Sequence, residues 1–67
     1  MNVLKVIEIM ASSKEGWEDA VKNAVKTAGK SVKGIRSVYV QDHSAVVQDN
    51  KINEYRVTCK ISFEVFD

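Results

Sequence analysis

One amphipathic segment between two β-patterned segments restricts this chain to few folds. From Trp17 onward, apolar residues recur every three or four positions and therefore share one face of a helix. Ser12 and Glu15 have the spacing of a capping box, with Ser13 as an alternative cap, and Gly34 suits the left-handed position after a helix. We therefore predict a helix that opens at Ser12–Glu15 and closes at Gly34. Its apolar face consists of Trp17, Ala20, Val21, Ala24, Val25, Ala28 and Val32.

The segments that flank the helix have the patterns of strands. Residues 3–10 form an apolar run, and residues 35–47 form a longer one, with a bend expected near Ser44 and Ala45. Residues 52–66 alternate between apolar and polar, which is typical of a half-buried strand. The turn at 48–51 contains Asp and Asn, which tolerate the positive φ of tight hairpins. The apolar row of the last strand, expected to lie under the helix, is Tyr55, Val57, Cys59, Ile61, Phe63 and Val65.

These elements predict an α+β fold in the order β-α-β-β. Since a crossover through a helix is right-handed, the first two strands run parallel, and the hairpin makes the last two antiparallel. The C-terminal strand then lies in the centre, in sheet order 1-3-2, with the helix on one face and the other face open. With a two-residue turn at Asp49 and Asn50, the pairs expected on the open face are His43 with Arg56, Gln41 with Thr58, Tyr39 with Lys60, and Ser37 with Ser62.

The chain is short for a self-sufficient core. We expect its 67 residues to form one domain, 1–67, and a domain of this size buries only about 60% of the surface of its unfolded chain. A single cysteine excludes an intrachain disulfide, and no cysteine or histidine spacing fits zinc. The strand at 35–47 is an edge without proline, which proteins rarely leave open. We therefore expect copies of the chain to associate with one another.

No group of residues in the sequence indicates catalysis. His43 is the only histidine, and a general base needs a nucleophile or a carboxylate beside it. Asp42 adjoins His43, but neighbours on a strand point to opposite faces. Cys59 lies in the apolar row, where a buried thiol is inert. We expect no catalytic residue and no enzymatic activity.

Charge and hydropathy limit the partners and the location. The net charge is only +1, and acids balance the lysines on the outer face of the helix. This face is predicted to be solvated, and neither nucleic acid nor a membrane is an expected partner. The run at 3–10 is interrupted by Lys5 and Glu8, is too short to span a membrane, and lacks the features of a secretory signal. With one thiol, a cytoplasmic location is expected.

The chain as a whole resembles the dodecins. This family consists of very small strand–helix–strand–strand proteins that assemble into hollow shells of twelve subunits, and many members bind flavins between subunits. The resemblance covers about residues 4 to 66, and it implies a homododecamer. The matching residues are Lys5 to Ile9, Ser12–Ser13 followed by Gly16–Trp17, Ala20, Ala24–Val25, Val40, and the run Tyr55 to Phe63.

The resemblance also assigns a ligand site and shows where this chain departs from it. Flavin-binding dodecins stack the flavin ring on a tryptophan that aligns with Ser37, and hydrogen-bond it with a glutamine that aligns with Arg56. An aspartate of the family corresponds to Asp42. Tyr39 lies on the same predicted face as Ser37, about 7 Å along the strand, and suits a ring only in another pose. The ligand-binding residues implied by family position are Ser37, Tyr39, Asp42 and Arg56.

Two kinds of shell follow from the resemblance. The first binds and stores a small molecule between subunits, either a flavin in an altered pose or an anion attracted by Arg56 and Lys60. The second binds calcium or is purely structural, because the chain is similar to a branch with Trp17 after the serines and Ile35–Arg36 before the second strand. At least one member of that branch is described as calcium-binding. The resemblance assigns no calcium ligands residue by residue.

Overall fold

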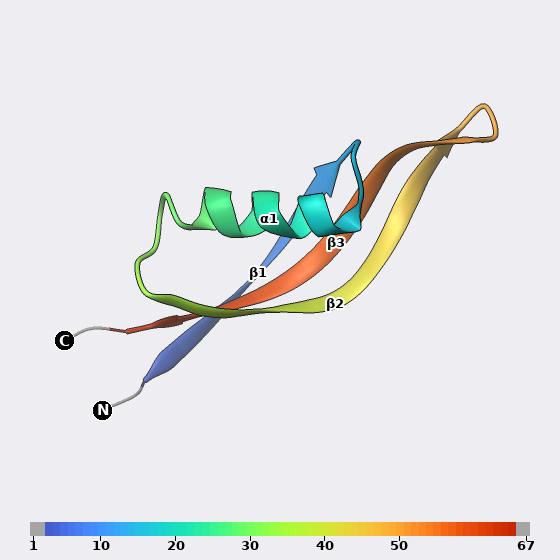
Figure 1. Ribbon diagram of the computed structural model, residues 1–67. Coiled ribbons are helices and arrows are strands. Elements are labelled where there is room, and N and C mark those ends of the chain that lie inside the picture. Colours follow the sequence, from blue (N-terminus) through green and yellow to red (C-terminus); the bar gives the residue numbers. More distant parts are fainter. Residues whose placement is uncertain (1–2, 66–67) are drawn as a thin grey trace.

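The structure, a computed structural model, describes residues 3–65 and has the predicted order of elements. Strand β1 spans Leu4–Ser13, helix α1 spans Trp17–Ala28, strand β2 spans Ile35–Gln48 and strand β3 spans Lys51–Glu64. The helix lies across one face of the sheet, and β2 and β3 continue beyond it as a long hairpin (Figure 1). The predicted β-α-β-β order is confirmed.

The sheet has the predicted topology. Strand β3 lies in the centre and pairs antiparallel with both neighbours, so the sheet order is β1-β3-β2 and the edge strands are parallel to each other. The core forms where the alanines of α1 meet the apolar row of β3. Small side chains let the helix approach the sheet closely, and Val57, Cys59 and Ile61 are the largest side chains that it covers completely. The fully buried or nearly buried apolar residues are Ala20, Ala24, Ala28, Val57, Cys59 and Ile61.

The pairing of β2 with β3 departs from the prediction after residue 40. Val40 pairs with Cys59 and Asp42 pairs with Thr58, so Gln41 is an extra residue without a partner on β3, which defines a β-bulge. One extra residue exchanges the faces of all residues that follow it. The irregularities of β2 lie near Arg36, at Gln41 and at Val46–Val47, instead of at the bend expected near Ser44 and Ala45.

Two of the four predicted pairs on the open face are therefore wrong. His43 pairs with Val57 on the helix face, and Ser44 takes its predicted place opposite Arg56. Asp42, expected on the helix face, lies on the open face instead of Gln41. The pairs Tyr39 with Lys60 and Ser37 with Ser62, which precede the bulge, are confirmed.

The ends of the helix also differ from the prediction. The residue before the first helical residue is Gly16, no side chain caps the helix, and β1 continues through Ser12 and Ser13. Instead of capping, the Ser13 hydroxyl accepts a hydrogen bond from the Glu15 N–H and donates one to Asp19 at 2.6 Å, which ties the strand end to the helix start.

At its other end, α1 stops at Ala28 because Gly29, a poor helix former, follows it. Hydrogen-bonded turns continue to Val32, whose N–H donates to the Ala28 carbonyl at 3.0 Å. Gly34 has the predicted positive φ, 72°, but it leads into β2 and does not end the helix.

The β2–β3 hairpin turns at Asp49 and Asn50, as predicted for a two-residue turn. Their φ angles are 54° and 62°, which are the left-handed values that such a turn requires. The hairpin makes the molecule long, with principal extents of 51 × 19 × 13 Å. Strand β3 was expected over 52–66 and is observed over Lys51–Glu64, while Phe66 lies outside the described residues.

Candidate functional site

The candidate site is the open face of the sheet, which consists of the side chains that point away from α1. The central strand contributes Arg56, Thr58, Lys60 and Ser62 to this face, and the register places residues of β1 and β2 on either side of them. Thus Lys60 lies between Glu8 and Tyr39, and Thr58 lies between Met10 and Asp42. Among residues 3–65, no helix covers this face.

The four residues assigned by family position share this face. Ser37, Tyr39 and Arg56 were predicted to lie there, and the bulge at Gln41 adds Asp42. Without that bulge the carboxylate would point toward α1. The structure therefore groups all four residues on one surface, although the sequence pattern placed only three of them together.

The open face is polar at its centre and has few internal contacts. The Ser37 and Ser62 hydroxyls are hydrogen-bonded to each other across the strands. Arg56 lies 3.4 Å from a carboxylate oxygen of Glu54, and its side chain is half exposed. Tyr39 is 63% exposed, an unusual environment for an aromatic ring. Arg56 also lines a shallow depression of about 370 Å³ with Met10, Ala11 and Ser12.

A flavin in the family's stacked pose does not fit these residues. At position 37 the chain has a small hydroxyl, already bonded to Ser62, where stacking requires an aromatic ring. Tyr39 is the only aromatic residue in the described part of the open face, and it lies about 7 Å further along the strand. A planar ligand on this face would therefore stack on Tyr39.

A complete calcium site does not fit a single copy either. Calcium takes 6–8 oxygen ligands, usually including several carboxylates. Among residues 3–65, no group of three or more His, Cys, Asp or Glu side chains is close enough to hold a metal ion. A calcium site that uses Asp42, on the open face, would therefore need the Asp42 carboxylates of several copies.

An aromatic cluster lies on the helix face. Trp17 and Tyr55 were both expected on this face, whereas His43 was expected on the open face. The Trp17 ring meets His43 and Tyr55 edge to face, with ring centroids 5.1 Å and 4.9 Å apart. Its indole N–H donates to the Ser44 carbonyl at 2.8 Å, across 27 residues of chain. This cluster fixes the start of α1 on the hairpin and explains where His43 lies. In the same core, burial raises the pKa of the Cys59 thiol, as expected for an inert cysteine.

The fold and the open face define a class of small α+β proteins with one helix on one face of a three-stranded sheet. The sequence matches the dodecin family over residues 3–66, and the chain belongs to this family.

The individual relatives differ in how similar their sequences are to this chain. The chain is 35% identical over 65 residues to calcium dodecin of Mycobacterium tuberculosis, covering 97% of this chain and 92% of the relative. The crystal structure of that calcium-chelating antigen has a TM-score of 0.83, at 37% identity, over 96% of this chain and 91% of its own. Dodecin from Streptomyces coelicolor has a TM-score of 0.94 at 23% identity, over 98% and 94% of the two chains, which shows the shared fold.

The helix α1 is too short and too polar to cross a lipid bilayer, and it is the only helix in the described part of the chain.

Proposed function

We propose that the protein forms a homododecameric shell that binds and stores a small ligand between subunits on their open faces. The grouping of Ser37, Tyr39, Asp42 and Arg56 on one uncovered surface carries this proposal. Family membership supports it, because dodecins assemble into such shells. We further propose that residues 1–67 form a single domain.

The shape of the chain supports self-association. Its radius of gyration is 13.6 Å, whereas a compact chain of this length has about 11 Å. In the described residues ten large apolar side chains, including Met10, Tyr39 and Val47, are exposed, whereas the buried apolar residues number six, three of which are alanines. A chain of this shape gains stability when copies cover its exposed side chains.

The charges of the open face suggest the chemistry of the ligand. Arg56 and Lys60 supply two cationic groups on the central strand, and Tyr39 supplies a ring beside Lys60. The surface therefore suits a small anionic molecule with a planar part that stacks on Tyr39, including a flavin in a pose other than the family's. The Arg56 guanidinium is charged and only donates hydrogen bonds, whereas the glutamine amide at the corresponding position of flavin-binding dodecins is neutral and both donates and accepts.

A second candidate function is a calcium-binding shell without an organic ligand. The relative that is 35% identical is named calcium dodecin, and that name is the specific observation that favours this alternative. Calcium would then bind where Asp42 carboxylates from neighbouring copies converge. Turnover is not part of either proposal. A cytoplasmic location suits a chain with one thiol.

Native mass spectrometry of the protein from its own host tests the proposal directly. We expect a mass of twelve chains plus a bound small molecule. The calcium alternative predicts a colourless dodecamer without organic ligand, whose melting temperature rises with added calcium. A monomer at micromolar concentration would contradict both.

The substitution Arg56→Glu tests the assignment of the face. It should leave the fold intact, because the side chain is half exposed, and weaken ligand binding or a subunit contact. An unchanged oligomer with unchanged ligand binding would show that the open face was assigned wrongly. Lys22→Glu, on the outer face of α1, is the matched control and should change neither property.

A further inference from the structure

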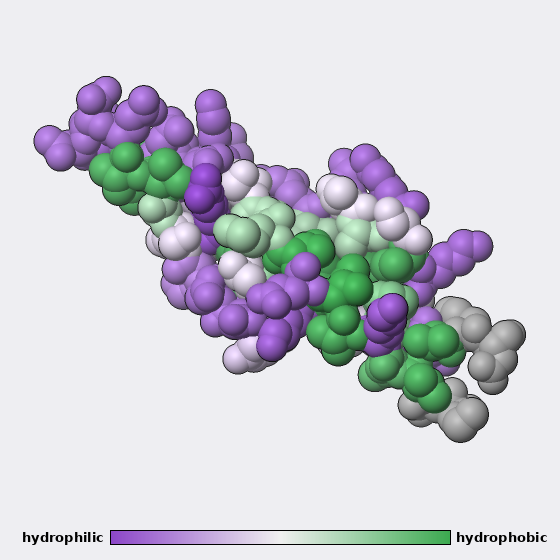
Figure 2. Space-filling model, turned by 180° about the vertical axis from the view of Figure 1, so that it is seen from behind, coloured by the Kyte–Doolittle hydropathy of each residue, from purple (hydrophilic) through white to green (hydrophobic). Residues whose placement is uncertain are grey.

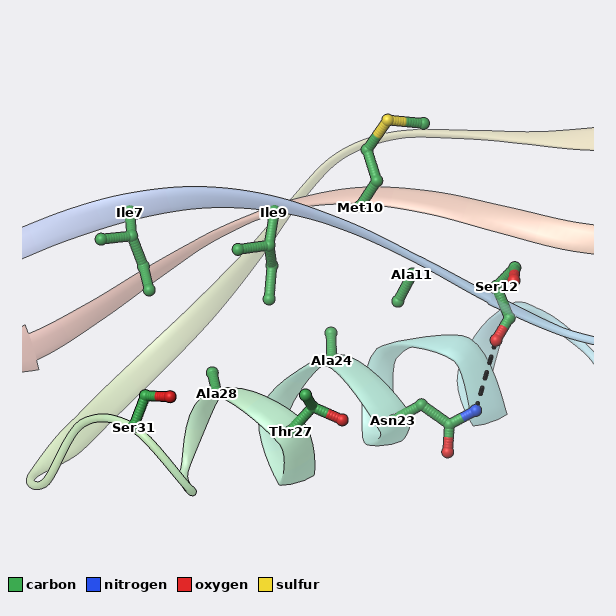
Figure 3. Close-up of a pocket in the computed structure, with 10 residues that line it drawn as sticks. All are labelled: Ile7, Ile9, Met10, Ala11, Ser12, Asn23, Ala24, Thr27, Ala28 and Ser31. Carbon is green, nitrogen blue, oxygen red and sulfur yellow. Dashed lines mark hydrogen bonds between the residues drawn. The ribbon is translucent and has the colours of Figure 1, made fainter.

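A second uncovered surface lies between β1 and α1, away from the open face. It is a groove of about 620 Å³ that opens at the free edge of β1. Ile7, Ile9 and Ala11 point from β1 toward the helix and form its apolar wall, whereas Met10 and Ser12 point away from it (Figure 3). The helix side of the groove consists of Asn23, Ala24, Thr27, Ala28 and Ser31.

The groove has no charged lining residue. Its rim is neutral and polar, and Asn23 closes one end by donating a hydrogen bond to the Ser12 carbonyl at 3.3 Å. An apolar occupant of the groove would therefore remove water from no charged side chain of the lining. Burial of a charged group is the largest cost of covering a surface, and it does not arise here. The size is within the range of sites that hold a few side chains or a small ligand, about 300–1,000 Å³.

The same chain has a segment with the chemistry to fill this groove. The part of the hairpin beyond the Trp17 cluster, residues 45–54, is here called the hairpin arm. Val47 and Ile52 are register partners on this arm and are 63% and 51% exposed. Figure 2 shows their end of the molecule as a small hydrophobic group in a hydrophilic surrounding, separate from the hydrophobic atoms near the other end.

The arm cannot reach the groove of its own chain. It extends from the sheet past the start of α1, whereas the groove runs along the helix toward its end (Figure 1). Any contact between them is therefore between two copies, and each copy offers both surfaces. Such a head-to-tail contact closes into a ring when its rotation divides a full turn.

We infer that the hairpin arm of one copy docks in the β1–α1 groove of the next, with Val47 and Ile52 against Ile7, Ile9 and Ala28. The inference rests on the proposed self-assembly and names the surfaces that produce it. The contact uses a surface distinct from the open face, so the shell has a subunit contact besides the faces that hold the ligand.

Disulfide trapping tests this contact. The double variant Ile52→Cys/Thr27→Cys places one thiol on the arm and one on the groove rim, both at exposed positions, while Cys59 stays buried. On mild oxidation we expect a ladder of linked chains in denaturing gels, and mass spectrometry of peptides should identify the 27–52 disulfide. The variant Ile52→Cys/Lys22→Cys, with its second thiol on the outer face of α1, and each single variant are the controls without that linkage.

The outcomes separate this inference from the proposed function. Native mass spectrometry of the unoxidised double variant gives the size of its assembly. A normal assembly without the 27–52 disulfide overturns the inference and leaves the shell in place. A wild-type chain that stays monomeric overturns both.

Discussion

Residue 17 shows how one side chain joins three elements of this fold. The Trp17 ring packs against His43 and Tyr55, and its N–H reaches the carbonyl of Ser44. Packing of this residue was predictable from its place on the amphipathic face. Its partner Tyr55 was expected on the same face, but His43 was not, because the face of His43 depends on a bulge that leaves no mark in the composition of β2.

The variant Trp17→Phe separates the hydrogen bond of Trp17 from its packing. Phenylalanine keeps a ring beside Tyr55 and removes the indole N–H, so we expect a loss of about 0.5–1.5 kcal/mol of unfolding free energy. Trp17→Ala should lower the unfolding free energy clearly more, because it also removes the ring contacts with His43 and Tyr55. Urea titration followed by circular dichroism measures both, and equal losses would show that the ring contacts contribute nothing.

The Cys59 thiol should react slowly in the native protein. The side chain is completely buried and its pKa is raised, so both access and the thiolate fraction are reduced. Reaction with a thiol reagent at pH 8 should be slow in buffer and fast in denaturant. Above about pH 8.5 the unfolded thiol ionises before the folded one, so stability should fall as pH rises. Rapid native labelling would mean that the core opens readily.

At the scale of elements, the bulge in β2 determines which side chains form the candidate site. Alternation in the sequence predicts faces only while the pairing stays regular, and Gln41 interrupts it. The same limit applies to the helix ends. The spacing of Ser12 and Glu15 is compatible with a cap, but in the structure β1 extends over Ser12 because its backbone pairs with Arg56.

Deletion of Gln41 should be tolerated. It removes the extra residue and leaves Val40 opposite Cys59 and Asp42 opposite Thr58, so the faces of β2 stay as they are. The matched control is deletion of Val40, which also removes the bulge but places Gln41 toward the helix. We expect that control to be the less stable of the two deletions, because a polar side chain replaces the half-exposed Val40 there. Equal stability of the two deletions in thermal melts would argue against the bulge.

Substitutions on the two opposite faces of β3 test which face lies beneath the helix. Val57→Asp places a carboxylate beneath α1, where only 1% of the residue is exposed, and should prevent folding. Ser62→Asp introduces the same group on the open face and should leave a folded protein, as measured by circular dichroism and gel filtration. A folded Val57→Asp protein would contradict the assignment of these faces.

For the whole molecule, folding and association are expected to be coupled. The long shape and the exposed apolar residues leave the single chain with a thin core. The sheet order was predictable, because a right-handed crossover leaves few alternatives. The location of the groove was not, because it depends on the gap between residues of β1 and of the helix side that lie 11 to 24 positions apart, from Ser12 and Asn23 to Ile7 and Ser31.

The melting temperature should therefore rise with protein concentration. Association that stabilises only the folded chain shifts the unfolding equilibrium by mass action. Calorimetry at a series of concentrations measures this shift. A melting temperature that does not depend on concentration, in a sample shown by sedimentation to dissociate on dilution, would mean that the isolated chain is stable by itself.

The two ends of the sheet core lie side by side, since Leu4 is the register partner of Glu64 and the Val65 N–H donates to the Val3 carbonyl at 2.8 Å. A short linker between those ends, with new termini at Asp49 and Asn50, would give a circular permutant in which every strand keeps its neighbour. In such a protein the order of synthesis changes while the sheet does not, and the severed tip becomes a place to attach a label or a cargo.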